Sequence, residues 1–356
     1  MGQWEFELLD TVGDALGSLS VAKSRKVTWY LDDAAKASFT IDGLHPQAEL
    51  ISETATDLRV YDPDHTVRFR GRMGSSNDDV SAAGHISNLT AVDYRGFLAR
   101  RTIWPTSTQS WLTTEQTAIG WQLINESQAL PGGALGITDG SSATGITRSP
   151  VYASGAAISK TITDLGNLAS GFDWEIDPNL SFNTFYPQRG IDPGITIAYG
   201  AEIASFRQTI DTGTFATAIR YSGDQSLVEQ VVTTTTFGAA GRWEIQIGDP
   251  SILNQSILNN RAQWELLKDQ VLTPSYELTL RPGWWTPDLL WLGDTVTLVL
   301  KSGKINVNKP FRIVRVDVTQ GDDGGQVVVL GCGNALTTQE KQLRQLIADV
   351  IQLQKR

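Results

Sequence analysis

The sequence has very little cysteine, methionine or histidine. Its 356 residues include one Cys, two Met and three His. A single cysteine excludes an internal disulfide and a zinc site built on cysteines. His45, His65 and His85 lack the spacing of a metal-binding pair, so we predict no metal site and no cofactor.

Long hydrophobic runs and targeting signals are missing as well. Glu5 and Glu7 stand where a signal peptide would carry basic residues ahead of an apolar stretch. No apolar run approaches the ~20 residues that cross a bilayer. We therefore expect the chain to be made and folded in a cytosol-like compartment.

Basic residues are outnumbered by acidic ones. The chain has 29 Lys and Arg against 39 Asp and Glu, a formal net charge of -10. A general nucleic-acid binder needs a basic face that displaces counterions, so this balance argues against such a function. It does not argue against a surface past which nucleic acid slides without being held.

Signatures of catalysis are equally scarce. No Gly-x-Ser-x-Gly nucleophile elbow occurs, and residues 300–304 lack the flanking glycine and hydroxyl residue of a phosphate-binding loop. Asp173 and Glu175 flank Trp174, and two carboxylates beside a ring that can stack on a sugar suit a glycoside hydrolase. An alternating strand with its acids in solvent explains these residues more simply, so we predict that the chain is not an enzyme.

What the sequence does contain is a repeated β-strand pattern. Trp4, Phe6 and Leu8 alternate with Glu5 and Glu7, as in a half-buried strand. Six strands are expected in the first hundred residues, at 4–8, 27–31, 37–41, 57–61, 66–73 and 86–94, with a polar loop over 74–84. Short strands at this spacing predict a small barrel or sandwich.

Near Pro105 the pattern changes to that of a small α/β unit. Residues 113–116 fit a capping box for a helix that runs to about Leu130. A loop rich in Gly, Ser and Thr over 131–155 precedes a second helix and a strand over 172–176. The apolar residues of the second helix are Ile158, Ile162, Leu165 and Leu168.

From about Gly194 the β-strand pattern returns, and it contains an echo of the first part. A helix over 254–269 interrupts the strands. The segment 311–315 resembles the arginine-bearing strand 69–72, and a polar loop with glycines and a second strand follow in both places. Two β-barrels of related design explain this echo, and so do two unrelated hairpins.

The C-terminal segment 336–356 has a helical repeat. Residues 337–340 form a capping box. The apolar stripe that follows the heptad spacing is Leu336, Leu343, Leu346, Ile347, Val350 and Leu353. We expect a coiled-coil-like helix that associates with other copies, because so short a helix needs partners to stay folded. A helix docked on its own domain is the alternative.

Six segments together resemble one family of proteins. They are Ala37–Pro46, Thr56–Tyr61, Phe69–Arg72, Thr90–Arg101, Asp164–Ile176 and Leu292–Val296. On these segments the chain is similar to the central tail-hub proteins (baseplate hub or minor tail proteins) of long-tailed siphophages, particularly those of actinobacteria. Each segment is weak alone because it encodes barrel turns, and their order along the chain carries the resemblance.

The resemblance implies a mainly β (α+β) fold with two small β-barrels of the tail-tube type. The first barrel would be 1–105, and the second would be discontinuous, with 195–240 and 284–335. The inserted α/β domain would be 106–194 together with 241–283. The helix 336–356 would stand on a threefold axis or join a central fibre.

The resemblance also implies partners and a place in the virion. Three copies would form a homotrimeric ring at the tail tip, below a hexameric ring of distal tail proteins, and would continue the tail tube. Other partners would be the tape measure protein, tail-tip or central fibre proteins, genomic DNA in transit and, indirectly, the host cell envelope. An acidic channel would let DNA pass without binding it.

Five arginines and three tryptophans are the candidate contact residues. The arginines that we expect to pair with acids of a neighbouring subunit or of the adjoining ring are Arg68, Arg70, Arg72, Arg312 and Arg315. Trp284, Trp285 and Trp291 would form a glycan platform or a subunit interface. A carbohydrate-binding receptor module is therefore one alternative function, and a cell-wall hydrolase that uses Asp173 or Glu175 is the other.

Overall fold

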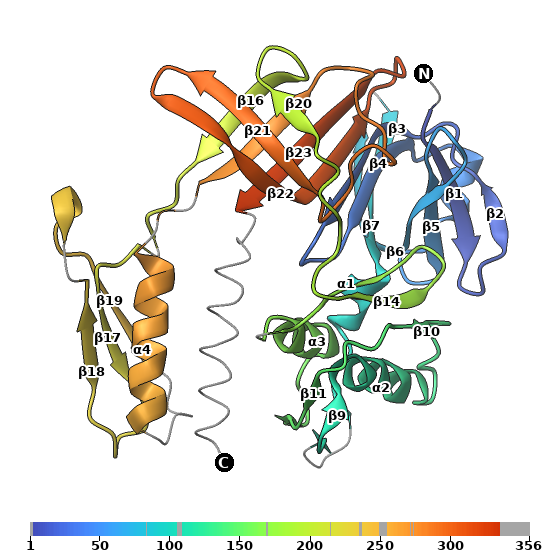
Figure 1. Cartoon of the computed structure of the whole chain (residues 1–356). Coiled ribbons are helices and arrows are strands. Elements are labelled where there is room, and N and C mark those ends of the chain that lie inside the picture. The colour runs from blue at the N-terminus through green and yellow to red at the C-terminus, as the bar shows by residue number, and fades with distance from the viewer. Residues whose placement is uncertain are drawn as a thin grey trace. The chain divides into compact units, whose positions relative to one another are not determined.

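The computed structural model confirms the mainly β fold expected from the sequence (Figure 1). It describes residues 3–82, 84–104, 109–168, 170–213, 215–234, 237–248, 255–270, 272 and 274–334. The predicted helix over 336–356 lies outside these residues, and so do Leu336, Leu343, Leu346, Ile347, Val350 and Leu353. Two compact units are present: unit 1 is Met1–Phe206 with Glu277–Cys332, and unit 2 is Arg207–Tyr276 with Gly333–Arg356. No helix in the described part is both long and apolar enough to cross a membrane.

The first strand group of unit 1 holds all six strands expected before residue 95, and a short extra one. Its strands are β1 (Glu5–Asp10), β2 (Ala15–Ser18), β3 (Lys23–Tyr30), β4 (Lys36–Asp42), β5 (Thr56–Tyr61), β6 (Val67–Ser81) and β7 (Gly84–Asp93), with a short 3-10 helix η1 (Pro46–Leu50). They lie in the order β3-β4-β7-β6-β5-β1-β2. Phe6, Leu8, Phe39, Leu58 and Phe69 are fully buried, because alternate residues of each strand face the core.

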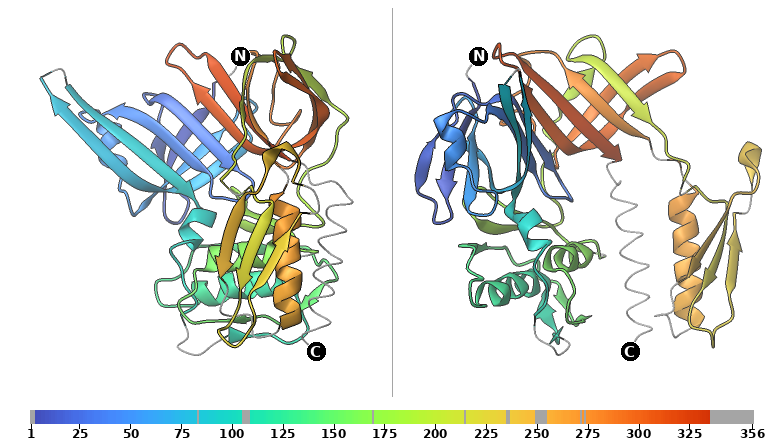
Figure 2. Two further views of the ribbon diagram at one scale, coloured as in Figure 1. Left: turned by 90° about the vertical axis from the view of Figure 1, so that its left-hand side faces the viewer. Right: turned by 180° about the vertical axis from the view of Figure 1, so that it is seen from behind.

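The polar segment 74–84 is not the loop that its composition predicted. β6 continues through it to Ser81 and pairs with β7 as far as Ser81 and Gly84. The two strands form an arm that projects from the rest of the group (Figure 2). Polar residues are tolerated here because the main chain satisfies its hydrogen bonds across the hairpin while the side chains stay in water.

The second strand group of unit 1 has the same strand order as the first. It consists of β15 (Thr196–Ala198), β16 (Ile203–Thr209), β20 (Ser275–Leu280), β21 (Thr295–Ser302), β22 (Ile305–Gln320) and β23 (Gln326–Asn334). The order β16-β20-β23-β22-β21-β15 matches β3-β4-β7-β6-β5-β1, strand for strand. One difference is that β15 runs parallel to β21, whereas β1 is antiparallel to β5. We call the two groups repeat 1 and repeat 2, and their common order favours duplication over two unrelated hairpins.

A ladder between β22 and β3 joins the two repeats. The strands are antiparallel, from Arg315 opposite Tyr30 to Gln320 opposite Arg25. All thirteen strands therefore belong to one continuous sheet. Apolar side chains on both strands are buried at this joint, among them Val316, Val318 and Trp29.

An α/β part follows repeat 1 within unit 1. Its elements are α1 (Tyr94–Leu98), β8 (Gln109–Ser110), β9 (Thr114–Glu115), α2 (Gln116–Gln128), β10 (Thr138–Gly140), β11 (Thr147–Arg148), β12 (Val151–Tyr152), α3 (Ile158–Gly166), β13 (Asp173–Ile176) and β14 (Ser181–Phe185). Ile119, Ile162 and Phe182 belong to its core. The predicted capping box is wrong: Glu115 is the N-cap of α2 without a side-chain cap, and its carboxylate accepts from the Thr144 N–H at 2.9 Å.

Unit 2 is a small layer of sheet and helix. It contains β17 (Ala218–Ser222), β18 (Gln230–Thr233), a 3-10 helix η2 (Gly238–Ala240), β19 (Glu244–Gly248) and α4 (Gln255–Asp269). The sheet order is β18-β17-β19, and Leu258 and Ala262 of α4 share a buried core with Ile219.

The expected grouping of 195–240 and 241–283 needs correction. β17 and β18 belong with β19 and α4 and not with the second strand group, because β17 pairs with both β18 and β19. For the same reason 241–269 does not join the α/β part. The chain leaves after β16 and returns at β20, and these two strands are neighbours in repeat 2.

Candidate functional site

The buried carboxylate of Asp57 binds two arginines of β6, Arg70 and Arg72. Asp57 on β5 is fully buried and lies opposite Arg72 in the ladder. It accepts hydrogen bonds from Arg72 Nε at 2.5 Å and from the Tyr94 hydroxyl at 2.6 Å, and Arg70 Nε lies 3.4 Å away. Burial and the neighbouring Asp57 carboxylate raise the pKa of the Tyr94 phenol, so it remains a donor.

Arg68, the third arginine of β6, joins the two repeats. Its guanidinium donates to Asp62 of repeat 1 at 2.6 Å and to Asp288, in the segment between β20 and β21, also at 2.6 Å. It also lies over the ring of Trp291, 5.8 Å from the centroid. Asp62 is buried, so this charge is neutralised inside the chain.

The arginines of β22 have partners within unit 1 as well. Arg312 pairs with Asp173 of β13 and donates to the carbonyl of Arg189 at 2.8 Å. Arg315 donates to Glu277 at 2.8 Å and lies 3.3 Å from Asp317.

The structure shows what these five arginines contact within the chain, and their contact with another subunit stays a prediction. We expected Arg68, Arg70, Arg72, Arg312 and Arg315 to meet acids of another subunit, but each has a carboxylate partner in its own chain. Strand pairing explains this, because it brings carboxylates of neighbouring strands and loops to the same side chains. The partners were missed because strand register is not visible in composition, although an acid on the strand just before the alternating arginines was a usable signal.

Four tryptophans form a chain of ring contacts across the joint of the repeats. Trp4 lies 5.6 Å from Trp29, Trp29 lies 5.0 Å from Trp291, and Trp291 stacks on Trp285 at 6.0 Å. The indole N–H of Trp285 donates to the Leu290 carbonyl at 2.9 Å. Trp285 is only 5% exposed, so it does not form an open glycan platform with Trp284 and Trp291. These rings instead pack the two repeats together.

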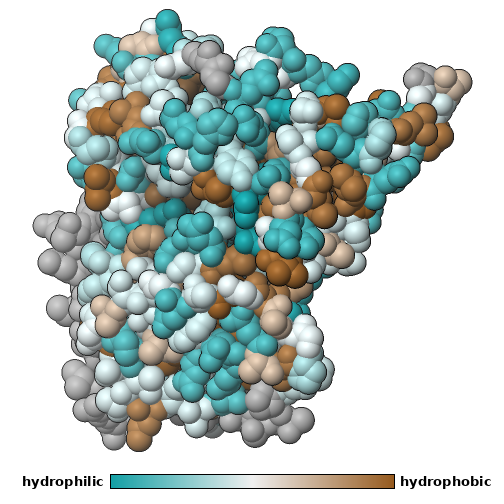
Figure 3. Space-filling view, turned by 90° about the vertical axis from the view of Figure 1, so that its right-hand side faces the viewer, coloured by the Kyte–Doolittle hydropathy of each residue, from teal (hydrophilic) through white to brown (hydrophobic). Residues whose placement is uncertain are grey.

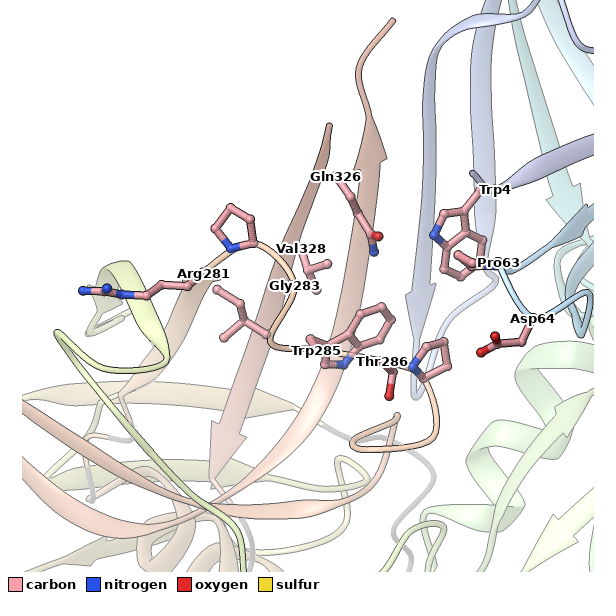
Figure 4. Close-up of a pocket in the computed structure, with 12 residues that line it drawn as sticks. Trp4, Pro63, Asp64, Arg281, Gly283, Trp285, Thr286, Gln326 and Val328 are labelled. Atoms are coloured by element: carbon pink, nitrogen blue, oxygen red, sulfur yellow. The ribbon is translucent and has the colours of Figure 1, made fainter. Parts of the chain in front are cut away.

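A cavity of about 210 Å³ opens beside this aromatic chain (Figure 4). Trp4, Pro63 and Asp64 of repeat 1 line one side, and Trp285 and Gln326 belong to the residues of repeat 2 on the other. The Trp4 indole N–H is buried and has no hydrogen-bond partner. The cavity is small and mostly apolar, and no pair of carboxylates faces into it.

The hydrolase candidates Asp173 and Glu175 are held in ion pairs. Besides Arg312, Asp173 accepts from the Arg189 N–H at 2.6 Å, and Glu175 lies 2.7 Å from Arg189 Nη1. Burial raises the pKa of Glu175, although Arg189 opposes the shift. Both carboxylates thus fix β13 to the segment that enters repeat 2. Within the described part of the chain, no three metal-ligating side chains cluster.

No protein-family model and no curated protein matches this sequence. Solved structures with a similar fold include prophage and other tail proteins. The 43 kDa tail protein of prophage MuSo2 from Shewanella oneidensis gives a TM-score of 0.66 at 14% identity, over 92% of this chain and 97% of that one. A tail protein of Neisseria meningitidis MC58 gives 0.66 at 14% identity, over 96% and 99%. Prophage tail protein gp18 of Listeria monocytogenes EGD-e gives 0.57 at 13% identity, over 98% and 99%. The chain has the fold of these tail proteins, as the sequence resemblance implied.

Proposed function

We propose that this chain is a structural protein of a phage tail and forms a trimeric hub at the distal end of the tail tube. The observation that carries the proposal is the pair of repeats with one strand order, joined edge to edge by β22 and β3. Three chains supply six repeats, which fits a hexameric ring of distal tail proteins above them. The shared fold with tail proteins over nearly their whole length supports the same role.

In this role the hub joins the distal tail ring to the tape measure protein and to tip or central fibre proteins, and genomic DNA passes through its ring. The paired arginines suit such a passage. Asp57, Asp62 and Asp288 neutralise the three arginines of β6, so these add little positive potential for phosphate to bind. The net charge of -10 has the sign that keeps DNA moving.

Two measurements test the proposal. Light scattering of the purified chain should give three times 38.8 kDa at high protein concentration. Antibody-labelled virions should carry the chain at the tail tip, in three copies per particle. Label along the tail shaft or on the capsid, or virions without the chain, would contradict a hub.

A further inference from the structure

Among the strand edges of unit 1 without a partner strand, one on β6 and one on β16 belong to different repeats. β6 pairs with β5 only as far as Arg72 and then continues to Ser81 with β7 alone. β16 has β20 on one side, and among the described strands no ladder covers its other side. A further β contact of this strand is an isolated bridge between Ile203 and Tyr199.

The joint inside the chain shows what such edges do. Arg312 of β22 lies opposite Thr295 of β21, and beyond it residues 315–320 of β22 pair with β3. Arg72 of β6 lies opposite Asp57 of β5 in the same way, and residues 75–81 follow it. In the common strand order, β6 takes the place of β22 and β16 takes the place of β3. The two open edges are thus the counterparts of the two strands that already pair.

We infer that the distal half of β6 in one copy pairs antiparallel with β16 of a second copy, as β22 pairs with β3 within one chain. The inference rests on the proposed function, because it names the edges by which the copies of the hub join. The occupant of each edge is another copy of this chain, and the internal ladder supplies its geometry. Main-chain hydrogen bonds carry the contact, as in other cases of strand addition.

The surfaces of both edges agree with burial in an assembly. Residues 77–81 are all exposed, as are Ala204 and Ser205 of β16. Near the end of the arm Val80 is 74% exposed and Ile86 is 53% exposed, and Figure 3 shows apolar atoms on a projecting arm. A two-stranded arm of this kind is marginally stable alone, and an uncovered edge invites pairing with other chains.

The contact is heterologous, since each copy would pair its β6 with one neighbour and its β16 with the other. Such contacts close into rings when the rotation between copies closes, and otherwise form filaments. Because the internal joint and the joint between copies would be alike, the repeats would alternate around the ring at equal steps. Three copies would then form one continuous sheet.

Engineered disulfides test the inference on the full chain. Cys332 is buried, and burial raises its pKa to about 12, so it does not compete for oxidation. The chain with Asn77→Cys on β6 and the chain with Ser205→Cys on β16 are mixed at about 1 mM total protein and oxidised. In a mixed trimer one Asn77→Cys edge faces one Ser205→Cys edge, so we expect about half of the protein to run as a disulfide-linked pair. The matched control combines Asn77→Cys with Ser18→Cys on β2, an exposed edge at the other end of the sheet, and should give little product.

The outcomes separate this inference from the proposed function. Trimers by light scattering without the Asn77→Cys and Ser205→Cys link, or with an equal link in the β2 control, would overturn the inference alone. A chain that stays monomeric at about 1 mM and forms no link would overturn both. Circular dichroism of each variant checks that the exposed cysteines leave the fold intact.

Discussion

The arm of repeat 1 and the matching strands of repeat 2 differ in what covers them. In repeat 2 the distal half of β22 lies against β3, and Val316 and Val318 are buried there. In repeat 1 the distal half of β6 carries Ser76, Asn77 and Asp78 along an edge with no partner strand. One strand order thus supports a permanent joint where its side chains are apolar and an open edge where they are polar. Polar edges keep the separate copy soluble until another chain covers them.

The repeats also differ in the source of the acid that neutralises their arginines. In repeat 1 Asp57 stands on the strand next to Arg72, whereas Thr295 occupies the matching place opposite Arg312. Arg312 obtains its carboxylate from Asp173 of the α/β part. At this matching place, Arg72 is therefore neutralised from within repeat 1, whereas Arg312 depends on an added segment.

Removing the internal acid of repeat 1 should have the largest effect. Asp57→Ala leaves Arg70 and Arg72 without their buried partner and should lower the free energy of unfolding by about 3–5 kcal/mol. Thr295→Ala, at the matching place, should cost less than about 1 kcal/mol. Urea unfolding curves of both variants check this. Equal losses of unfolding free energy would show that Asp57 is no more important for stability than the residue at the matching place in repeat 2.

A smaller effect is expected from opening a cavity at the joint. Val316→Ala removes two methyl groups from a fully buried site opposite Trp29 and should cost about 1–3 kcal/mol. Val80→Ala on the arm should change the stability of the separate chain by no more than about 0.5 kcal/mol. Thermal unfolding of both variants at low protein concentration makes the measurement. A large loss for Val80→Ala would mean that the arm is already covered in the monomer.

The pH dependence of repeat 1 should also set it apart, because its β7 ends in Asp93 where β23 of repeat 2 ends in Asn334. Burial raises the pKa of Asp93 from 3.8 to about 7, although the N–H groups of Gly96 and Ala35 donate to it. The folded chain then holds a proton between about pH 4 and 7 that the unfolded chain has lost, so this residue makes stability fall as pH rises through that window. Asp93→Asn should flatten the fall.

Urea unfolding at several pH values compares the two proteins. A pH profile of Asp93→Asn that is parallel to that of the wild type would show that Asp93 titrates normally in the fold. Asp93→Asn also removes the oxygen that accepts the Ala35 N–H, which lowers the free energy of unfolding equally at every pH. It therefore does not change the slope of the pH profile.

The smallest effect should follow from making the two repeats more alike. β3 and β4 are joined by a short turn, whereas unit 2 lies between β16 and β20. Replacing residues 210–274 with a five-residue turn should leave unit 1 folded, with its melting temperature changed by no more than about 4 °C. Calorimetry of the shortened chain makes the measurement. Loss of cooperative unfolding would show that repeat 2 needs unit 2 in order to fold.

The sequence predicted the strands better than the contacts between them. Period-two alternation around Trp4, Phe6 and Leu8 located β1 because one face of that strand is buried. The distal part of β6 was missed because residues 74–79 are all glycine, serine, asparagine or aspartate, so apolar alternation carries no signal there. The boundaries of unit 2 were missed because local pattern does not show which strand β17 pairs with.

The sequence identified the candidate arginines by residue type, but it did not show which residues they contact. Alternation correctly indicated that Arg68, Arg70 and Arg72 share a strand. Their acids, Asp57 and Asp62, come from elsewhere in the chain, and pairing of that kind is decided by three-dimensional register. Trp29 escaped notice because nothing in its neighbourhood distinguishes a tryptophan at a joint from one in a core.

Unit 2 interrupts only one of the two repeats, and this has a consequence for the symmetry of any closed assembly. Along the sheet, successive repeats present the same strand order, so a partner that docks on the sheet meets two similar positions per chain. A partner that docks on the insertion meets one. A ring of such chains is therefore an adaptor between two symmetries, with twice as many binding positions for what contacts the sheet as for what contacts the insertion.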